Sequence, residues 1–304
     1  MVPRMVLGMR PDATGLEPEK VPAPHPPATP ARAPLGPPPL ALLSPFERAS
    51  FRLIDALWTR HRWLTEAYNK TVGVGYVLGG SGKMLQVRGL ERLRALKPTD
   101  GILLVSNHRS FFDLYELIAT LYKRTPLRQP TLCPVRSKFF YERPLGVMVN
   151  LLAGGGRMYP PFFRESSKLE FNKWSIARTA EELRNGSVIV GFHPEGTRNK
   201  NVDPYTPLPA QPGVGKLVME CWPIIVPAFI NGMSQNILSD VRANFTGERF
   251  AVAVFGEPID LTAFKSHTNR LATHKRIADH LLQAIYRLGD EERQVRAEIL
   301  ATRR

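Results

Sequence analysis

Residues 101–113 read GILLVSNHRSFFD: an apolar run, a polar turn and the start of a second apolar segment. The unbroken run over residues 101–105 predicts a buried strand, and the pattern over residues 111–123 predicts a helix. His108 then lies in the strand-to-helix turn, and Asp113 lies in the first helical turn. Inside one helix the two side chains would point about 140° apart, at roughly 100° per residue. Across a turn, the carboxylate can fold back onto the imidazole.

At the level of these residues alone, two interpretations of the turn stay open. An Asp that binds one ring nitrogen of a His fixes the tautomer and leaves the other nitrogen able to accept a proton, which is the arrangement of a general base. Ser110-x-x-Asp113 is also a capping box, which begins a helix and needs no chemistry.

A second polar turn follows a second apolar run. Residues 187–192 predict a buried strand, which leads into HPEGTRNK at residues 193–200. Pro194 and Gly196 predict a tight turn, with Glu195 and Arg198 projecting over the edge of the sheet. In α/β proteins the carboxyl ends of the strands are where binding sites form. The alternative is a plain turn with a local ion pair.

Apolar strands alternate with helical segments along most of the chain. This order predicts an α/β fold, with a mostly parallel central sheet flanked by helices. We expect strands over residues 83–90, 102–105, 131–135, 187–192, 224–230 and 250–255, and helices over residues 45–68, 111–123, 168–184, 214–222 and 270–304.

The chain divides into three parts. Residues 1–40 hold 12 of the 28 prolines, so we expect a disordered Pro-rich tail over residues 1–44. Residues 45–80 predict an amphipathic helical region in which Trp58 and Trp63 stand among arginines. Such a helix can lie in a membrane interface or pack against its own domain, and the sequence leaves both open. Residues 81–304 predict the main α/β domain, ending in a long helix.

Charge and composition restrict the class of partner. Lys and Arg number 41 against 27 Asp and Glu, a net charge of +14, which favours nucleic acid, a membrane surface or a phosphorylated or CoA-like substrate. No recognised nucleic-acid motif is present. The two cysteines, Cys133 and Cys221, have no metal-like spacing and indicate a reducing compartment. Without a spanning apolar run or a secretory leader, we expect a cytoplasmic protein with at most peripheral membrane contact.

Taken together, the two turns resemble a known family. Asn107-His108-x-Ser110-x-x-Asp113, followed about 80 residues later by Pro194-Glu195-Gly196-Thr197-Arg198, is similar to the glycerolipid acyltransferases, which act on lysophosphatidate and glycerol 3-phosphate. The similarity covers roughly residues 83–260. Three further segments resemble the family in order and spacing: residues 87–91, 136–140 and 225–228.

One position departs from the family pattern. The family has an arginine six positions after a glycine, and this arginine is associated with the phosphate of the acceptor. Counting from Gly156, that position is Phe162 in this chain. The nearest arginine is Arg164, two residues late, and Arg157 is another candidate.

The resemblance implies transfer of a fatty acyl group from acyl-CoA or acyl carrier protein to a hydroxyl group. The first-choice acceptor is 1-acyl-glycerol 3-phosphate, and the alternatives are glycerol 3-phosphate, another lysolipid or a lipid alcohol. His108 would act as general base with Asp113 orienting it. The acceptor would be held by Glu195, Gly196, Thr197, Arg198 and Arg164. No metal and no cofactor is implied, and residues 139–152 would line part of the acyl site.

A lipid substrate also implies an anionic membrane surface as partner, with the enzyme peripheral on the inner face of the membrane. No nucleic acid is implied. The rival interpretation from another class is a basic lipid-binding or nucleic-acid-binding protein without catalysis.

Overall fold

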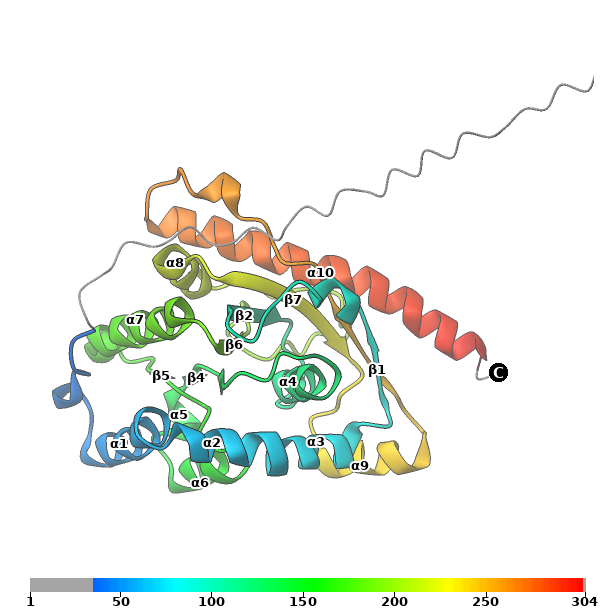
Figure 1. Cartoon of the computed structure of the whole chain (residues 1–304), viewed down its shortest axis with the longest axis horizontal. Helices are drawn as coiled ribbons and strands as arrows, with labels where there is room; N and C mark the ends of the chain where they lie inside the picture. Colours follow the sequence, from blue (N-terminus) through cyan, green and yellow to red (C-terminus); the bar gives the residue numbers. More distant parts are fainter. Residues whose placement is uncertain (1–34, 303–304) are drawn as a thin grey trace, which may run out of the picture.

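A six-stranded sheet forms the centre of the computed structural model, which describes residues 35–302 (Figure 1). Its strand order is β1-β8-β7-β2-β6-β3, and only β7 and β8 pair antiparallel. The predicted α/β class with a mostly parallel sheet is confirmed. The strands are β1 (Leu85–Arg88), β2 (Gly101–Ser106), β3 (Thr131–Leu132), β6 (Val188–Phe192), β7 (Ile224–Asn231) and β8 (Ala251–Phe255).

Both faces of the sheet are buried under helices. In β2, Leu103 and Val105 join one apolar cluster while Ile102 and Leu104 join another, as the alternation of side chains along a strand requires. The first cluster includes residues of α7 (Leu169–Asn185), α8 (Pro212–Cys221) and α10 (Leu271–Thr302); the second includes residues of α4 (Asp113–Arg124) and α9 (Ile237–Thr246). Central strands covered on both sides explain the unbroken apolar runs in the sequence.

The N-terminal helical region is longer and more divided than the predicted helix over residues 45–68. It contains α1 (Pro45–Thr59), α2 (Arg62–Tyr68) and α3 (Val74–Ser81), with a π-helical turn over Asn69–Gly73. In Figure 1 these helices form a layer along the lower edge of the molecule. Across the described residues, no helix has the length and apolar character that crossing a membrane requires.

The two faces of α1 have different surroundings. Phe51, Ile54 and Trp58 are buried, and the indole Nε1 of Trp58 donates a hydrogen bond to Glu182 of α7 at 2.8 Å. Trp58 is therefore a core residue, so of the two alternatives that the sequence left open, this side of α1 packs against its own domain. Trp63, at the start of α2, keeps 69% of its surface exposed.

Order begins before the predicted tail ends. Residues 1–34 lie outside the described part of the chain, so the expected disorder there stays a prediction. Leu40–Leu42 form a 3-10 turn, and Leu43 is buried. Arg48 donates to the carbonyls of Leu40 and Leu43, each at 3.1 Å. Burial of Leu43 and these two hydrogen bonds fix the last residues of the predicted tail.

The predicted strand over residues 131–135 splits at Pro134, which has no N–H to donate. Its two halves are β3 and β4 (Val135–Arg136), and β4 pairs with β5 (Pro161–Phe162) in a separate two-stranded sheet. Between β4 and β5 lie two short helices, α5 (Ser137–Phe140) and α6 (Pro144–Leu152).

The triple glycine after α6 lets this segment approach the N-terminal helices closely. Gly155 has a φ of +55°, and a Cβ there would lie 2.7 Å from the ring of Tyr68 and 2.8 Å from the side chain of Asn69. The carbonyl of Gly155 accepts a hydrogen bond from Asn69, and the carbonyl of Leu152 accepts one from Tyr68. The helical region is thereby fixed against α6.

Candidate active site

His108 and Asp113 meet at the carboxyl end of β2. Nδ1 of His108 lies 3.4 Å from Oδ2 of Asp113, the first residue of α4. The His108 side chain is 20% exposed, whereas that of Asp113 is buried. Within the described part of the chain, Nε2 of His108 has no hydrogen-bond partner. The pair thus has the arrangement expected of a general base, because a buried carboxylate contacts one ring nitrogen and the other ring nitrogen is available.

Asp113 also organises the turn around the ring. Its Oδ2 accepts hydrogen bonds from the backbone N–H groups of Arg109 at 2.6 Å and Ser110 at 2.7 Å. The second half of a capping box is missing, because Ser110 Oγ accepts from Phe112 N at 3.3 Å and donates to the carbonyl of Ser234 at 2.6 Å. The Asp113 carboxylate is therefore placed both to accept backbone N–H groups at the start of α4 and to contact the ring of His108, so both interpretations of the turn stay open.

Burial shifts both pKa values of the pair. Desolvation raises the pKa of Asp113 to about 7, opposed by the electrostatic interaction with His193, by the backbone N–H groups of Ser110 and Arg109 and by the charge of Arg109. Desolvation and the nearby Arg198 guanidinium lower the pKa of His108 to about 4. At neutral pH the imidazole is uncharged, which is the form that accepts a proton.

A second imidazole lies directly against the first. The rings of His108 and His193 stack with centroids 3.8 Å apart and planes inclined by 7°. Nδ1 of His193 is 3.2 Å from both the hydroxyl and the carbonyl oxygen of Ser106, at the end of β2. The sequence motif contains His193, but nothing in its spacing predicts the stack, which depends on the pairing of β2 with β6.

Glu195 faces inward and does not open onto the cleft, where we expected it to hold the acceptor. Its Oε2 accepts from the backbone N of His108 at 3.0 Å. Its Oε1 accepts from Leu208 N at 2.9 Å, Asn199 Nδ2 at 3.1 Å and the hydroxyl of Tyr286 at 2.9 Å. Only 1% of the residue is exposed. Because these four internal donors occupy its oxygens, Glu195 supports the catalytic turn and is not placed to bind substrate. Tyr286 belongs to α10 and had no signal in the motifs.

Thr197 and Arg198 of the second turn do face outward. Gly196 has a φ of +65°, and its N–H donates to the carbonyl of His193 at 2.9 Å, which closes the turn. Thr197 and Arg198 are exposed. Arg198 NH1 donates to Gln235 Oε1 at 2.5 Å. The guanidinium of Arg136 lies 3.8 Å from the place that a Cβ on Gly196 would occupy. Arg136 is therefore a cation beside this turn that sequence reasoning did not assign to the acceptor.

The two arginines considered for the displaced family position occupy different surroundings. Arg157 is 3% exposed and packs over the ring of Tyr115 at 4.4 Å, so it is a core residue. Arg164 is exposed, two residues beyond β5. In the described part of the chain, no hydrogen bond or ion pair joins Arg164 to the turns that carry His108 and Arg198.

An apolar pocket of about 540 Å³ lies beside the catalytic turn. Phe112, which immediately precedes α4, and Glu116, in the first turn of α4, both line it. Leu152 is the one residue of the predicted acyl segment, 139–152, that reaches this pocket; Leu151 instead lines a separate groove of about 450 Å³ between α6 and α1. Other walls of the 540 Å³ pocket come from α3, α9 and the residues after β7, including Tyr76, Val77, Met233 and Val241.

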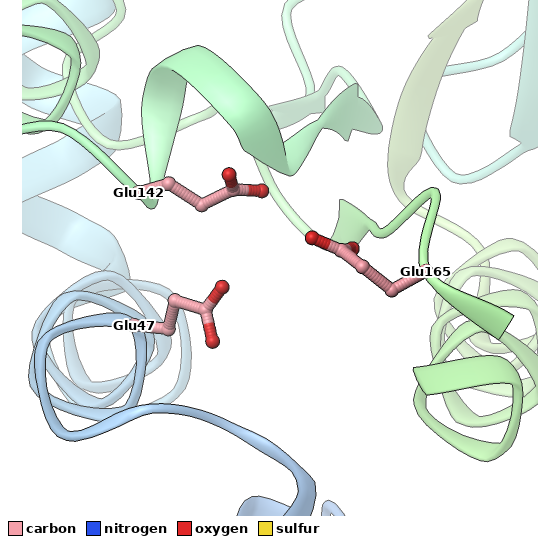
Figure 2. A group of neighbouring side chains, drawn as sticks. All are labelled: Glu47, Glu142 and Glu165. Carbon is pink, nitrogen blue, oxygen red and sulfur yellow. The ribbon is translucent and has the colours of Figure 1, made fainter. Parts of the chain in front are cut away.

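Three carboxylates gather away from the catalytic turn. Glu47, Glu142 and Glu165 bring one oxygen each to within 4.8 Å of one another, as Figure 2 shows. Lys168 already supplies a cation there, since its Nζ is 2.6 Å from Glu47 and 3.7 Å from Glu165. Glu142 accepts from Ser137 Oγ at 2.7 Å. The side chains of the protein thus satisfy this cluster, and nothing in it calls for a metal.

Comparison with known proteins assigns a family to the part of the chain that contains the two turns. Residues 84–231, which contain both turns, match the model of the family described as Acyltransferase. A similar solved structure is the crystal structure of the 1-acyl-sn-glycerophosphate (LPA) acyltransferase, PlsC, from Thermotoga maritima, which is 16% identical with a TM-score of 0.49 over 80% of this chain and 87% of that chain. No curated protein sequence matches. The resemblance seen in the sequence is confirmed at the level of the family.

Proposed function

We propose that this chain, whose residues 84–231 are an acyltransferase-family domain, transfers a fatty acyl group from a thioester to the hydroxyl of a glycerophospholipid precursor. The observation that carries the proposal is the imidazole of His108, uncharged at neutral pH, backed by Asp113 at 3.4 Å and with Nε2 available. Acyl-CoA and acyl carrier protein are both donors of the required chemistry.

The first step activates the acceptor. An alcohol is a poor nucleophile until its proton is withdrawn, and Nε2 of His108 takes that proton as the alcohol oxygen attacks the thioester carbonyl. General-base catalysis of this kind contributes roughly 10²–10⁴-fold to the rate. Asp113 accepts the Nδ1–H of the ring and stabilises the imidazolium that forms.

The second step expels the thiol. The tetrahedral intermediate collapses, the C–S bond breaks, and the leaving sulfur takes the proton from the imidazolium. The products are an ester and a free thiol, and His108 returns to its neutral form. Every proton is accounted for by the two substrates and one histidine, so the proposed reaction uses no cofactor and no metal.

The apolar pocket beside α4 is our candidate for the acyl chain. Its volume of about 540 Å³ and its lining by Phe112, Leu152 and Met233 support this assignment. Because Phe112 directly precedes Asp113, a chain in this pocket would begin close to the base. The acceptor phosphate would bind where Arg198 and Arg136 lie beside the second turn, since guanidinium groups suit phosphate geometry. On this basis the first-choice acceptor remains 1-acyl-glycerol 3-phosphate.

Exposed apolar side chains on α2, α3, α6 and α9 support contact with a membrane. Trp63 of α2, Tyr76 of α3 and Leu152 of α6 are 69%, 70% and 60% exposed, and Leu238 and Phe245 of α9 are 74% and 68% exposed. Several large apolar side chains with more than half of their surface exposed are consistent with an interaction site. We therefore place the enzyme peripherally on an anionic leaflet, with its pocket opening toward the lipid.

The test is release of free thiol from acyl-CoA and from acyl carrier protein. Wild-type protein is assayed with lysophosphatidate, glycerol 3-phosphate, other lysophospholipids and a lipid alcohol, beside His108→Ala. We expect acceptor-dependent thiol release that falls by 10²-fold or more in the variant, with unchanged unfolding temperature. If a folded His108→Ala protein matches wild type, the catalytic proposal is wrong. A non-catalytic basic lipid-binding protein would then be the better explanation.

A further inference from the structure

The contact between the rings of His108 and His193 assigns a role to a residue outside the proton-transfer pair. We propose that His193 is a positioning residue: its fixed ring holds the imidazole of His108 in the single orientation that the reaction needs. This inference rests on the proposed function, because it concerns the same base.

His108 needs a second anchor because Asp113 alone holds it weakly. The Nδ1–Oδ2 distance of 3.4 Å is long for a hydrogen bond, whereas the same oxygen accepts two backbone N–H groups at 2.6 and 2.7 Å. Rotation of a histidine ring about χ2 has a broad energy profile. The ring of His193 restricts this rotation directly, because it lies nearly parallel to the ring of His108, with centroids 3.8 Å apart and planes inclined by 7°.

His193 is itself held firmly enough to act as a support. It follows β6, whose Phe192 pairs with Val105 of β2. Its Nδ1 is 3.2 Å from the carbonyl oxygen of Ser106, which can only accept, so Nδ1 carries the proton and the ring is the neutral Nδ1–H tautomer. Its position is therefore set by the central sheet.

Neutrality of the support matters to the chemistry. His108 becomes positive when it takes the acceptor's proton, and a second positive ring at 3.8 Å would oppose that step. Around the stacked pair lie Asp113 from α4, Arg109 from the first turn, and Glu195 and Arg198 from the second turn. Burial and the neighbouring His108 lower the pKa of His193 to about 3, so it stays neutral while His108 cycles.

The experiment compares His193→Ala, His193→Gln and His193→Phe with a matched control, His280→Phe, on α10 away from the cleft. Phe keeps a flat ring, whereas Ala and Gln do not. We expect kcat to fall roughly 10–100-fold in the Ala and Gln variants with KM for donor and acceptor unchanged within about 2-fold. The Phe variant should recover to within about 5-fold of wild type, and the control should show no change.

A second readout does not depend on turnover. In protein with ¹⁵N-labelled histidine, the ring nitrogen shifts of His108 report its tautomer. One tautomer is expected in wild type and His193→Phe, and averaged shifts in His193→Ala and His193→Gln. If wild type shows no acyl transfer, the proposed function fails while this measurement still tests the support.

Two results would overturn the inference. One is a folded Ala or Gln variant with wild-type kcat and a single His108 tautomer. The other is an equal loss of kcat in His193→Phe and His193→Gln, which would assign the effect to the ring nitrogen and not to the stacked plane. If His193→Ala does not fold, the comparison of the Gln and Phe variants decides between these outcomes.

Discussion

The two turns at the ends of β2 and β6 are neighbours in the sheet, but they use their polar side chains in opposite ways. The turn after β2 leaves the His108 side chain partly exposed, with a ring nitrogen available. The turn after β6 directs Glu195 inward, where its oxygens meet four donors. In our proposal one turn carries the reacting atom, and the other fixes the backbone that carries it.

This difference shows that a motif of reactive-looking residues need not consist of reacting residues. A carboxylate with no exposed oxygen cannot bind a substrate, whatever its place in a motif. Removing a reacting side chain should affect rate alone, whereas removing a support should affect rate and stability together. The predictions below use that distinction.

The largest effect is expected for Glu195→Ala compared with His108→Ala. Loss of Glu195 leaves buried donors without an acceptor, each costing about 1–3 kcal/mol. We expect the free energy of unfolding to fall by about 3 kcal/mol or more, with activity lost as well. His108→Ala should lose activity while its denaturant midpoint stays at the wild-type value. Equal stability of the two variants would remove the distinction between the turns.

A smaller effect, visible in the pH profile, is expected at Asp113. Because burial raises the pKa of its carboxyl to about 7, Asp113 becomes protonated as the pH falls through that value and no longer stabilises the imidazolium. Activity of the wild type should therefore decline below about pH 7, well above the pKa of His108, which is about 4. Asp113→Asn should be slower by on the order of 10²-fold and lose this dependence. A wild-type profile that stays flat down to pH 5 would contradict the assignment.

Substituting the outward-facing arginines should weaken binding of the acceptor and leave the fold unchanged. Arg198→Ala and Arg136→Ala are each expected to raise KM for a phosphorylated acceptor about 10-fold, equivalent to about 1.4 kcal/mol. Arg164→Ala serves as the matched control, since it is exposed but not joined to either turn, and its KM should remain unchanged. Should Arg164 alone raise KM, the acceptor phosphate binds near β5 and our placement is wrong.

The smallest effect concerns the membrane. Leu64 on α2 is 47% exposed and Leu300 on α10 is 50% exposed, so Leu→Ala at each removes a similar apolar surface. Flotation with anionic vesicles should weaken a few-fold for Leu64→Ala and not at all for Leu300→Ala, because burying a leucine contributes about 1.5–3 kcal/mol at most. Binding should also fall as salt rises. Equal behaviour of the two variants, or insensitivity to salt, would count against docking through the N-terminal helices.

Much of the fold was predictable because central strands buried on both faces leave unbroken apolar runs, as in residues 101–105 and 224–230. The meeting of His108 with Asp113 was also accessible, since both belong to one short turn. The break of the N-terminal helix at residues 60–61 was not, because no proline or glycine marks it.

The unpredicted parts of the site depend on contacts between distant segments. Tyr286 reaches Glu195 from α10, 91 positions along the chain, and His193 reaches His108 only because β6 pairs with β2. Arg136 is brought beside Gly196 by the segment that follows β3. No local pattern encodes such distances. Helical spacing also placed Trp58 on the apolar face of α1, but the choice between a membrane interface and packing within the domain needed the contact with Glu182 of α7.

The inward placement of Glu195 has a consequence for altering substrate preference. Thr197 and Arg198 are outward-facing positions of the same turn, and they make none of the hydrogen bonds through which Glu195 holds the backbone of His108. Libraries that vary Thr197, Arg198 and Arg136 could change the preference for the acceptor while the backbone around His108 is kept. Libraries that vary Glu195 would mostly yield proteins that do not fold, because its four buried donors would lose their acceptor. Within the five-residue motif Pro194–Arg198, we therefore expect Thr197 and Arg198 to tolerate substitution and Glu195 not to tolerate it.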